Sequence, residues 1–174
     1  MEYMRATISM ANTRDAEILT TLGAASYRSH FSSVWTRQGL DDYVTTEYAR
    51  DRIRREPTGI LTYYFLSRAG GVPVGFTKVT LGQSIPLSDK AGMELEKVYL
   101  LPEFTGAGHC SALIVHAIEF AAGCSQESVW LNVLKENQSG RRLYERLGFI
   151  VTAELPFATD LREVGFWTMA RQAA

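Results

Sequence analysis

Gly106 and Gly108 stand between an apolar run that ends near Leu101 and a helical pattern that begins near Gly108. A glycine turn that opens a helix exposes backbone N–H groups, and such groups bind phosphate oxygens. The dinucleotide pattern Gly-x-Gly-x-x-Gly is not met, because Ser111 or Ala112 stands where another glycine is required. No Gly-Lys-Ser/Thr follows, so the P-loop pattern fails as well. Taken alone, the turn fits a phosphate cradle and an ordinary strand-to-helix turn equally well.

A second candidate lies further along the chain, where an apolar run over 128–134 leads into a helical pattern. Asn137 and Tyr144 are seven residues apart in that pattern, about two helical turns, so they project from one face. Asn137 also suits the N-cap position, and Tyr144 alone would suit a core residue. Both segments occur in one chain, in order, each in a strand–helix context. Together they predict a site that holds a phosphorylated carrier and acts at its far end.

Alternating strands and helices must position these residues. Thr13 is the predicted cap of the first helix, and Ala69-Gly70-Gly71 predicts a hairpin. The predicted strands lie at about 3–10, 61–68, 72–81, 92–101, 128–134, 149–155 and 163–170. The predicted helices lie at about 14–23, 108–122 and 137–147, with further helical material over 26–56 that ends at Pro57-Thr58-Gly59. The fold class is therefore α/β, a single domain over residues 1–174 with a mixed central sheet of about seven strands and about four flanking helices.

The composition is that of an ordinary soluble domain, with 174 residues, 46% hydrophobic, 21% charged and a net charge of −1. No Lys/Arg cluster predicts nucleic-acid binding, no apolar stretch is long enough for a membrane span, and no signal peptide is apparent. Cys110 and Cys124 are the only cysteines; they fit a reducing cytosol, so we expect a cytoplasmic protein. About 20 Å of predicted helix separates them, too far for a disulfide. The cysteines and histidines show no metal-ligand spacing, so no metal is predicted.

The two segments together resemble the signatures of the GNAT superfamily of acetyl-CoA-dependent N-acetyltransferases. The run Thr105-Gly106-Ala107-Gly108-His109-Cys110 is similar to the family's phosphate loop, and the stretch from Asn137 through Tyr144 to Gly148-Phe149 resembles its Asn, Tyr and Gly-Phe positions. The predicted order of strands and helices is also that of the family fold. Thr105 departs from the family's Gln or Arg, which removes one side chain that could reach the pyrophosphate. Cys110 has no His/Asp partner apart from neighbouring His109, which argues against a nucleophilic cysteine.

The resemblance implies acetyl-CoA as cosubstrate and gives roles to individual residues. The backbone of Val98, Tyr99 and Leu100 would pair with the pantetheine arm, and an N–H there would polarise the thioester carbonyl. Asn137 would bond the pantetheine arm, and Tyr144 would donate a proton to the departing thiolate. The backbone amides that would hold the pyrophosphate are those of Gly106, Ala107, Gly108, His109, Cys110 and Ser111.

The acceptor amine must lose a proton before it attacks, and for a free alkylamine this costs about 4–5 kcal/mol at neutral pH. Glu94 and Glu96 are the candidate general bases, because they lie two apart on a predicted strand and so share a face. Glu94 lies where some family members place their base. Both carboxylates could instead face solvent or pair with Lys97 or with arginines.

Residues 26–56 are expected to wall the acceptor site, and the run from Tyr27 through Trp35 to Arg55 resembles part of the bacterial polyamine acetyltransferases. Its aromatic and acidic side chains would suit an aliphatic polyamine cation, although the aromatics could equally pack helices onto the sheet. The predicted function is acetyl transfer from acetyl-CoA to a primary amine of a small molecule, by direct attack in a ternary complex. Protein N-termini, lysines, antibiotics and amino acids stay open as acceptors.

Two other classes of function are compatible with the same residues. One is a non-catalytic acyl-CoA-binding or sensor module, and the other is a nucleotide-binding regulator. A proton donor such as Tyr144 favours the enzyme, because a binding module needs none at the sulfur. Exposed strand edges leave room for a homodimer, and no nucleic-acid or membrane partner is expected.

Overall fold

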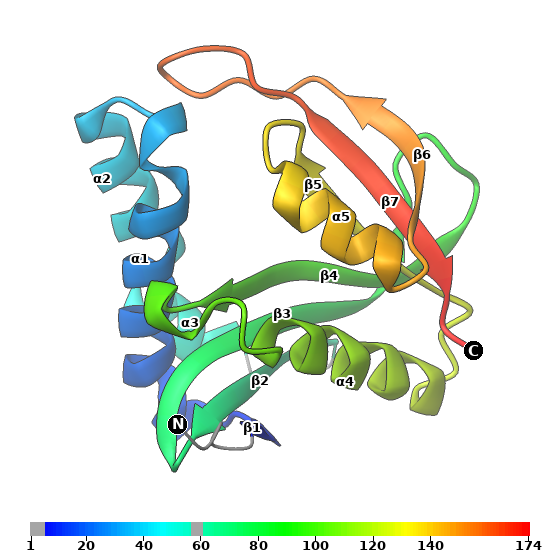
Figure 1. Ribbon diagram of the computed structural model, residues 1–174, viewed down its shortest axis with the longest axis horizontal. Coiled ribbons are helices and arrows are strands. Elements are labelled where there is room, and N and C mark those ends of the chain that lie inside the picture. Colours follow the sequence, from blue (N-terminus) through cyan, green and yellow to red (C-terminus); the bar gives the residue numbers. More distant parts are fainter. Residues whose placement is uncertain (1–5, 57–60) are drawn as a thin grey trace.

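The computed structural model describes residues 6–56 and 61–174 (Figure 1). Within them the chain forms one seven-stranded sheet in the order β1-β2-β3-β4-β5-β7-β6. Neighbouring strands are antiparallel except for β4 and β5, which are parallel. The strands are β1 Ala6–Met10, β2 Thr62–Ala69, β3 Val72–Ser84, β4 Ala91–Leu100, β5 Ser128–Leu134, β6 Ile150–Leu155 and β7 Phe166–Gln172. The predicted mixed sheet is confirmed.

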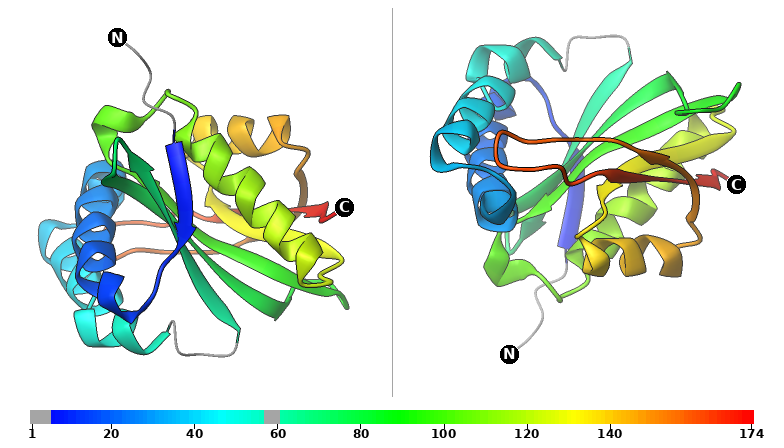
Figure 2. Two further views of the ribbon diagram at one scale, coloured as in Figure 1. Left: turned by 90° about the horizontal axis from the view of Figure 1, so that it is seen from below. Right: turned by 90° about the horizontal axis from the view of Figure 1, so that it is seen from above.

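Helices cover both faces of the sheet (Figure 2). One face carries α1 (Ala16–Phe31), α2 (Arg37–Glu47) and the six-residue α3 (Arg50–Arg55), and the other carries α4 (His109–Gly123) and α5 (Gln138–Arg146). Each layer buries its own apolar cluster, Leu19, Leu22 and Phe76 under α1 and Leu113, Ile114 and Phe149 under α4. The described residues thus hold four helices of at least nine residues and one short one, which confirms the predicted single α/β domain.

The hairpin between β2 and β3 follows from two adjacent glycines. Gly70 and Gly71 have φ angles of 56° and 84°, as a two-residue turn between twisted strands requires. The turn sets the register Ala69↔Val72, so alternate side chains of both strands reach the two cores. This part of the prediction is confirmed.

β4 and β5 separate soon after they meet, and this creates the space for a site. Their pairing is limited to Met93↔Val129 and Glu94↔Trp130, whereas β5 and β7 pair along their full length. Gly92 permits the close approach at the joined end, because a Cβ there would lie 2.4 Å from the Ser128 carbonyl oxygen. Beyond Glu94 the facing edges of the two strands are left without a neighbour.

A bulge in β4 changes which side chains face which layer. Lys78 pairs with Lys97 but Val79 pairs with Leu95, so Glu96 is an extra residue on β4. Before the bulge Leu95 packs under α4, and after it Leu100 does so, while Tyr99 packs under α1. The bulge therefore lets Glu96 and the adjacent Lys97 both face the α1 layer.

Some element boundaries differ from the predictions. Asn12, not Thr13, is the first cap: its side chain accepts from the Arg14 N–H, and Asp15 returns a bond to the Asn12 N–H, so that Thr13–Asp15 forms a short 3₁₀ turn before α1. The helix continues past Gly23 to Phe31, so this glycine does not end it; it makes room for the ring of Tyr48, which occupies the space that a side chain there would fill.

The last strand begins at Phe166, later than predicted, because residues 156–165 form a long connection from β6. The start of the strand predicted over 3–10 and the whole of Pro57-Thr58-Gly59 lie outside the described residues. Over the described ranges, none of the helices is long and apolar enough to cross a bilayer. The cytoplasmic location stays a prediction.

Candidate active site

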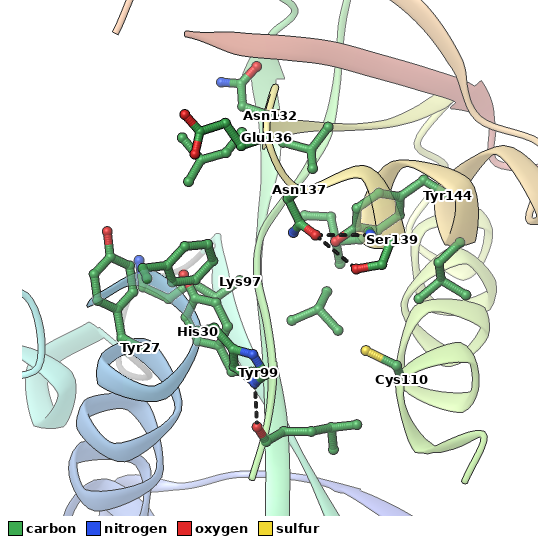
Figure 3. Close-up of a pocket in the computed structure, with 18 of the residues that line it drawn as sticks. Tyr27, His30, Lys97, Tyr99, Cys110, Asn132, Glu136, Asn137, Ser139 and Tyr144 are labelled. Atoms are coloured by element: carbon green, nitrogen blue, oxygen red, sulfur yellow. Dashed lines mark hydrogen bonds between the residues drawn. The ribbon is translucent and has the colours of Figure 1, made fainter. Parts of the chain in front are cut away.

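A cavity of about 960 Å³ opens where β4 and β5 part. Its walls come from α1, α2, β4, β5, the turn before α4 and the start of that helix, α5, the β6–β7 connection and the start of β7 (Figure 3). The predicted site residues that line it are Glu94, Glu96, Val98, Tyr99, Leu100, Gly106, Gly108, Cys110, Ser111, Asn137 and Tyr144. The structure therefore brings two distant segments of the sequence to one space.

The turn before α4 presents unpaired amides to this cavity. Gly106 and Gly108 have φ angles of 81° and 84°, and a Cβ at either would meet no atom within 4 Å. No side chain caps the helix, and its first internal bond runs from the Ala112 N–H to the Gly108 carbonyl. The N–H groups from Gly108 to Ser111 thus have no intrahelical acceptor, and they form an anion-binding end.

Two predicted residues of the turn lie off the cavity wall. Ala107 is exposed, and the His109 ring is buried beneath the turn. That ring lies 3.5 Å from the Ser67 hydroxyl and edge-on to Phe104. His109 therefore supports the turn with its side chain, and any contact of these two residues with a ligand is limited to their backbone.

Asn137 caps α5 and still faces the cavity. Its side-chain oxygen accepts from the Gly140 N–H at 3.0 Å and from the Ser139 hydroxyl at 3.3 Å, which leaves its amide N–H₂ free to donate (Figure 3). Gly140 is required for this geometry, because a Cβ there would lie 2.6 Å from the Asn137 amide nitrogen. The prediction that Asn137 is an N-cap is confirmed.

Tyr144 lies on α5 opposite Cys110 on α4, and both face the same space (Figure 3). Its ring packs edge-on against Phe149, and its hydroxyl makes no hydrogen bond to another described residue. Burial, and to a smaller extent the nearby Cys110 thiol, raises the pKa of the phenol above 10. Burial also raises the pKa of the Cys110 thiol to about 11. Both groups hold their protons at neutral pH.

The exposed edge of β4 offers alternating backbone groups to the cavity. The Leu101 N–H donates to the Val74 carbonyl of β3, so by alternation the N–H of Tyr99 also faces β3, and those of Val98 and Leu100 face the gap. Tyr99 consequently contributes its ring to the cavity, and only Val98 and Leu100 retain free backbone groups there. His30 of α1 bonds the Leu100 carbonyl at 3.2 Å, a contact that nothing in the sequence pattern indicates.

Glu94 and Glu96 both line the cavity but differ in their partners. Glu96 accepts from the Thr80 hydroxyl at 2.6 Å and pairs with the Lys78 ammonium at 2.8 Å. The Glu94 carboxyl has neither a hydrogen bond nor an ion pair with the described residues. Burial, followed by repulsion from Glu96, raises the pKa of Glu94 to about 7, although Lys78 and Lys97 oppose the shift.

A chain of charged groups runs from Glu96 beneath the α1 layer. Lys78, 5% exposed, lies between Glu96 and Glu56, and Arg52 joins Glu56 to Glu47. The chain ends where Glu47 accepts from Lys97 at 2.7 Å in the cavity wall. These partners hold Glu96 and Lys97 in fixed charged pairs, and leave Glu94 as the carboxyl free to exchange a proton.

The far end of the cavity is walled by aromatic rings from residues 26–56, as predicted. Tyr27 packs on Phe31 and Tyr43 with centroid distances of 4.7 and 4.6 Å, and the Tyr27 hydroxyl accepts from Trp35. Only α1, α2 and the turn between them reach the cavity from this region. Cavity residues outside the predicted set include Asn132, Leu134, Glu136, Phe157 and Phe166. Phe157 and Phe166 lie in segments without a recognisable motif.

No group of His, Cys, Asp or Glu able to hold a metal occurs among residues 6–56 and 61–174. Both cysteines are free thiols.

Comparison with known proteins agrees with this geometry. The model of the acetyltransferase (GNAT) family matches residues 24–149. An uncharacterized N-acetyltransferase from Mycobacterium tuberculosis is 25% identical over 158 residues, which are 91% of this chain and 97% of the relative. The PaiA N-acetyltransferase from Thermoplasma acidophilum in complex with coenzyme A superposes with a TM-score of 0.77 at 20% identity, over 97% of this chain and 99% of that one. A mutant spermidine N-acetyltransferase from Vibrio cholerae superposes with a TM-score of 0.71 at 16% identity, over 97% and 94% of the two chains. The chain belongs to the GNAT family of acetyltransferases and is an acetyl-CoA-dependent N-acetyltransferase.

Proposed function

We propose that this enzyme acetylates a primary amine of a small molecule, by direct attack of the amine on acetyl-CoA in a ternary complex. The observation that carries the proposal is Glu94, a carboxyl in the cavity wall without a fixed partner among the described residues. Its pKa of about 7 lies close to neutral pH, where a general base works best. Glu94 takes the proton of the attacking ammonium, directly or through a water molecule.

The remaining roles follow from what each group can donate. The open amides from Gly108 to Ser111 hold the diphosphate of acetyl-CoA, and the Asn137 amide N–H₂ bonds its pantetheine arm. The free N–H groups of Val98 and Leu100 pair with that arm along the edge of β4, and one of them polarises the thioester carbonyl. Acetyl-CoA supplies the activated acyl group.

Tyr144 donates the proton that the departing thiolate needs. The phenol is protonated at neutral pH, because its pKa is raised by burial. A raised pKa also makes it a weaker acid, but a thiolate formed in the same place is a stronger base than in water. The Cys110 thiol lies in the same wall, and burial there raises its pKa to about 11, which shows the same effect on a thiol. Burial therefore raises both the pKa of the phenol that donates the proton and the pKa of the thiol that receives it.

The acceptor end favours an aliphatic cation. The faces of Tyr27, Phe31, Tyr43 and Tyr99 surround it, and the carboxylate of Glu96 and the carboxyl of Glu94 lie beside them. Aromatic faces and carboxylates both attract an alkylammonium group, so a polyamine-like molecule is the acceptor that we propose. The Vibrio cholerae spermidine N-acetyltransferase shares the fold, but its substrate is known by name for that protein and is not carried over to this chain.

Thiol release from acetyl-CoA tests the proposal. The purified chain is mixed with acetyl-CoA and, separately, with diaminobutane, spermidine, free lysine, an aminoglycoside and a short peptide with a free N-terminus. We expect release with the diamine or spermidine and an acetylated product by mass spectrometry. Tight coenzyme A binding without release for any amine would support a binding module instead. Preference for the peptide would point to protein acetylation. The homodimer stays a prediction, which light scattering checks.

A further inference from the structure

The connection between β6 and β7 passes over the acceptor end of the cavity. We call residues 156–165 the strap; in Figure 1 it runs from the β6–β7 hairpin across to α2. Internal bonds shape it, including those from Val164 and Gly165 to the Phe157 carbonyl and from Thr159 to the Arg162 carbonyl. Phe157 of the strap lines the cavity and packs on Phe166 with a centroid distance of 4.5 Å.

One end of the strap is fastened to the start of α2. The Asp160 carboxylate accepts from the Thr36 N–H at 3.0 Å and from the Thr36 hydroxyl, and the Thr159 hydroxyl donates to the Val34 carbonyl. Thr36 is itself the N-cap of α2 and accepts from the Gly39 N–H at 3.1 Å. Gly39 must lack a side chain, because a Cβ there would lie 2.0 Å from the Asp160 carboxylate. The Asp160 carboxylate thus meets the positive end of a helix at short range.

The strap is fastened a second time to the turn after β5. The Arg162 guanidinium pairs with both oxygens of Glu136, and Glu136 lines the cavity. The Lys135 N–H also donates to the Gly165 carbonyl at 3.1 Å. Arg162 and Glu136 are exposed, so this pair alone would be weak, but it acts together with the Asp160 bonds.

These contacts frame the acceptor end of the cavity. β4, α1, the turn before α2 and the turn after β5 all line it, and the strap, which contributes Phe157 to the lining, crosses above them (Figure 2, right). The frame joins segments more than 120 residues apart in the sequence, Thr36 and Asp160. A strap fastened on both sides limits the width of an acceptor molecule that can reach Glu94.

We propose that the strap, held by Asp160, is a size filter for the acceptor: it admits the unbranched end of an alkylamine and excludes the chain terminus of a polypeptide. The inference rests on the proposed function and makes Asp160 a specificity-determining residue that does not touch the reacting atoms. It also gives a physical reason for the choice of small amines over proteins.

The test compares kcat/KM for diaminobutane with kcat/KM for a short peptide that has a free α-amino group. For Asp160→Ala we expect the ratio of diamine to peptide to fall at least about tenfold, through a gain with the peptide, while the KM for acetyl-CoA stays within about twofold. Asp160→Asn keeps one oxygen for the Thr36 N–H, so its ratio of diamine to peptide should lie between those of the wild type and Asp160→Ala. Glu163→Ala removes an exposed carboxylate from the same strap and should leave the ratio unchanged.

Hydrogen exchange of the strap amides shows whether the strap has loosened. Faster exchange in Asp160→Ala with an unchanged ratio would overturn the filter, and so would an equal loss with both acceptors or a wild type that accepts the peptide as well as the diamine. If Asp160→Ala does not fold, Asp160→Asn and Arg162→Ala decide by the same ratio. A wild type that acetylates no amine refutes the proposed function and the filter together, whereas an active wild type with an unmoved ratio refutes only the filter.

Discussion

Glu94 and Glu96 lie two residues apart on one strand, and their surroundings give them different chemistry. Glu96 has Thr80 and Lys78 as partners, which hold its carboxylate in place. Glu94 is half-buried without such a partner, and its pKa rises to about 7. The sequence predicts that both side chains lie on one face of the strand. It does not indicate which of the two carboxyls has partners, because Lys78 and Thr80 belong to another strand.

Glu94→Gln should remove the general base. For the wild type we expect kcat/KM to rise with pH through about 7, because the carboxyl must lose its proton before it can accept one. In the variant kcat/KM should fall by about 10²–10⁴, and the rising limb of the pH profile, the part in which kcat/KM increases through pH 7, should disappear. Glu96→Gln is the control: it keeps the base, and it shifts the limb to lower pH because repulsion from Glu96 is lost. A limb near pH 7 that persists in Glu94→Gln would assign the base elsewhere.

The same substitution should stabilise the protein at high pH. The pKa of Glu94 is raised from 4.5 to about 7 on folding, so between these values the folded state holds the extra proton and stability falls as pH rises. Glu94→Gln should therefore be more stable than the wild type at pH 8, by at most about 3 kcal/mol, and nearly equal at pH 4. Thermal unfolding at the two pH values measures this. Equal stability at pH 8 would mean that the carboxylate is well solvated.

Tyr144→Phe tests the proton donor with a change of one atom. The ring still packs on Phe149, so cofactor binding should be nearly unchanged. Turnover should fall about ten- to a thousandfold, the range of general-acid catalysis or below. Single-turnover thiol release and the dissociation constant for acetyl-CoA separate the two effects. An unaffected rate would remove Tyr144 from the mechanism.

At the scale of elements, the glycine turn before α4 and the cap of α5 are the parts that local sequence predicts well. The turn depends on the backbone of Gly106 and Gly108, and the cap depends on a contact of Asn137 with a residue three positions away. Nearby residues therefore determine the geometry of both. The divergence of β4 from β5 and the strap could not be predicted in the same way. They depend on Gly92 meeting Ser128 and on Thr36 meeting Asp160, pairs that only the folded chain brings together.

Gly108→Val should weaken acetyl-CoA binding. The φ angle of 84° is accessible to glycine and strained for a branched residue, so the turn must change and its amides must move. We expect the dissociation constant to rise at least about tenfold. Gly123→Val at the other end of α4 is the matched control, since a Cβ there meets open space at an ordinary φ angle. An unchanged dissociation constant in Gly108→Val would count against the phosphate cradle.

At the scale of the whole molecule, the sheet consists of two parts joined at the start of β4 and β5. β1 to β4 form one part and β5 to β7 the other, with two residue pairs between them. A ligand laid along the gap contacts both parts, so its binding should stabilise the whole fold and not only the turn that holds its phosphates.

Coenzyme A at about a hundred times its dissociation constant should stabilise the fold by about 2.7 kcal/mol, which corresponds to a rise in Tm of about 5–10 °C. ATP at the same concentration is the comparison, because it carries phosphates but no pantetheine arm for the edge of β4. A larger shift with ATP would support the nucleotide-binding regulator and contradict the enzyme. Differential scanning calorimetry measures both shifts.

The bulge at Glu96 also constrains how this protein can evolve. Loss of that one codon would straighten β4 and leave Met93, Leu95, Val98 and Leu100 all facing the layer under α4, because Leu95 and Val98 would then lie two positions apart. Descendant sequences can therefore lose Glu96 and keep the packing of this strand, but they also lose the carboxylate that pairs with Lys78, so the constraint lies on the charge and not on the strand.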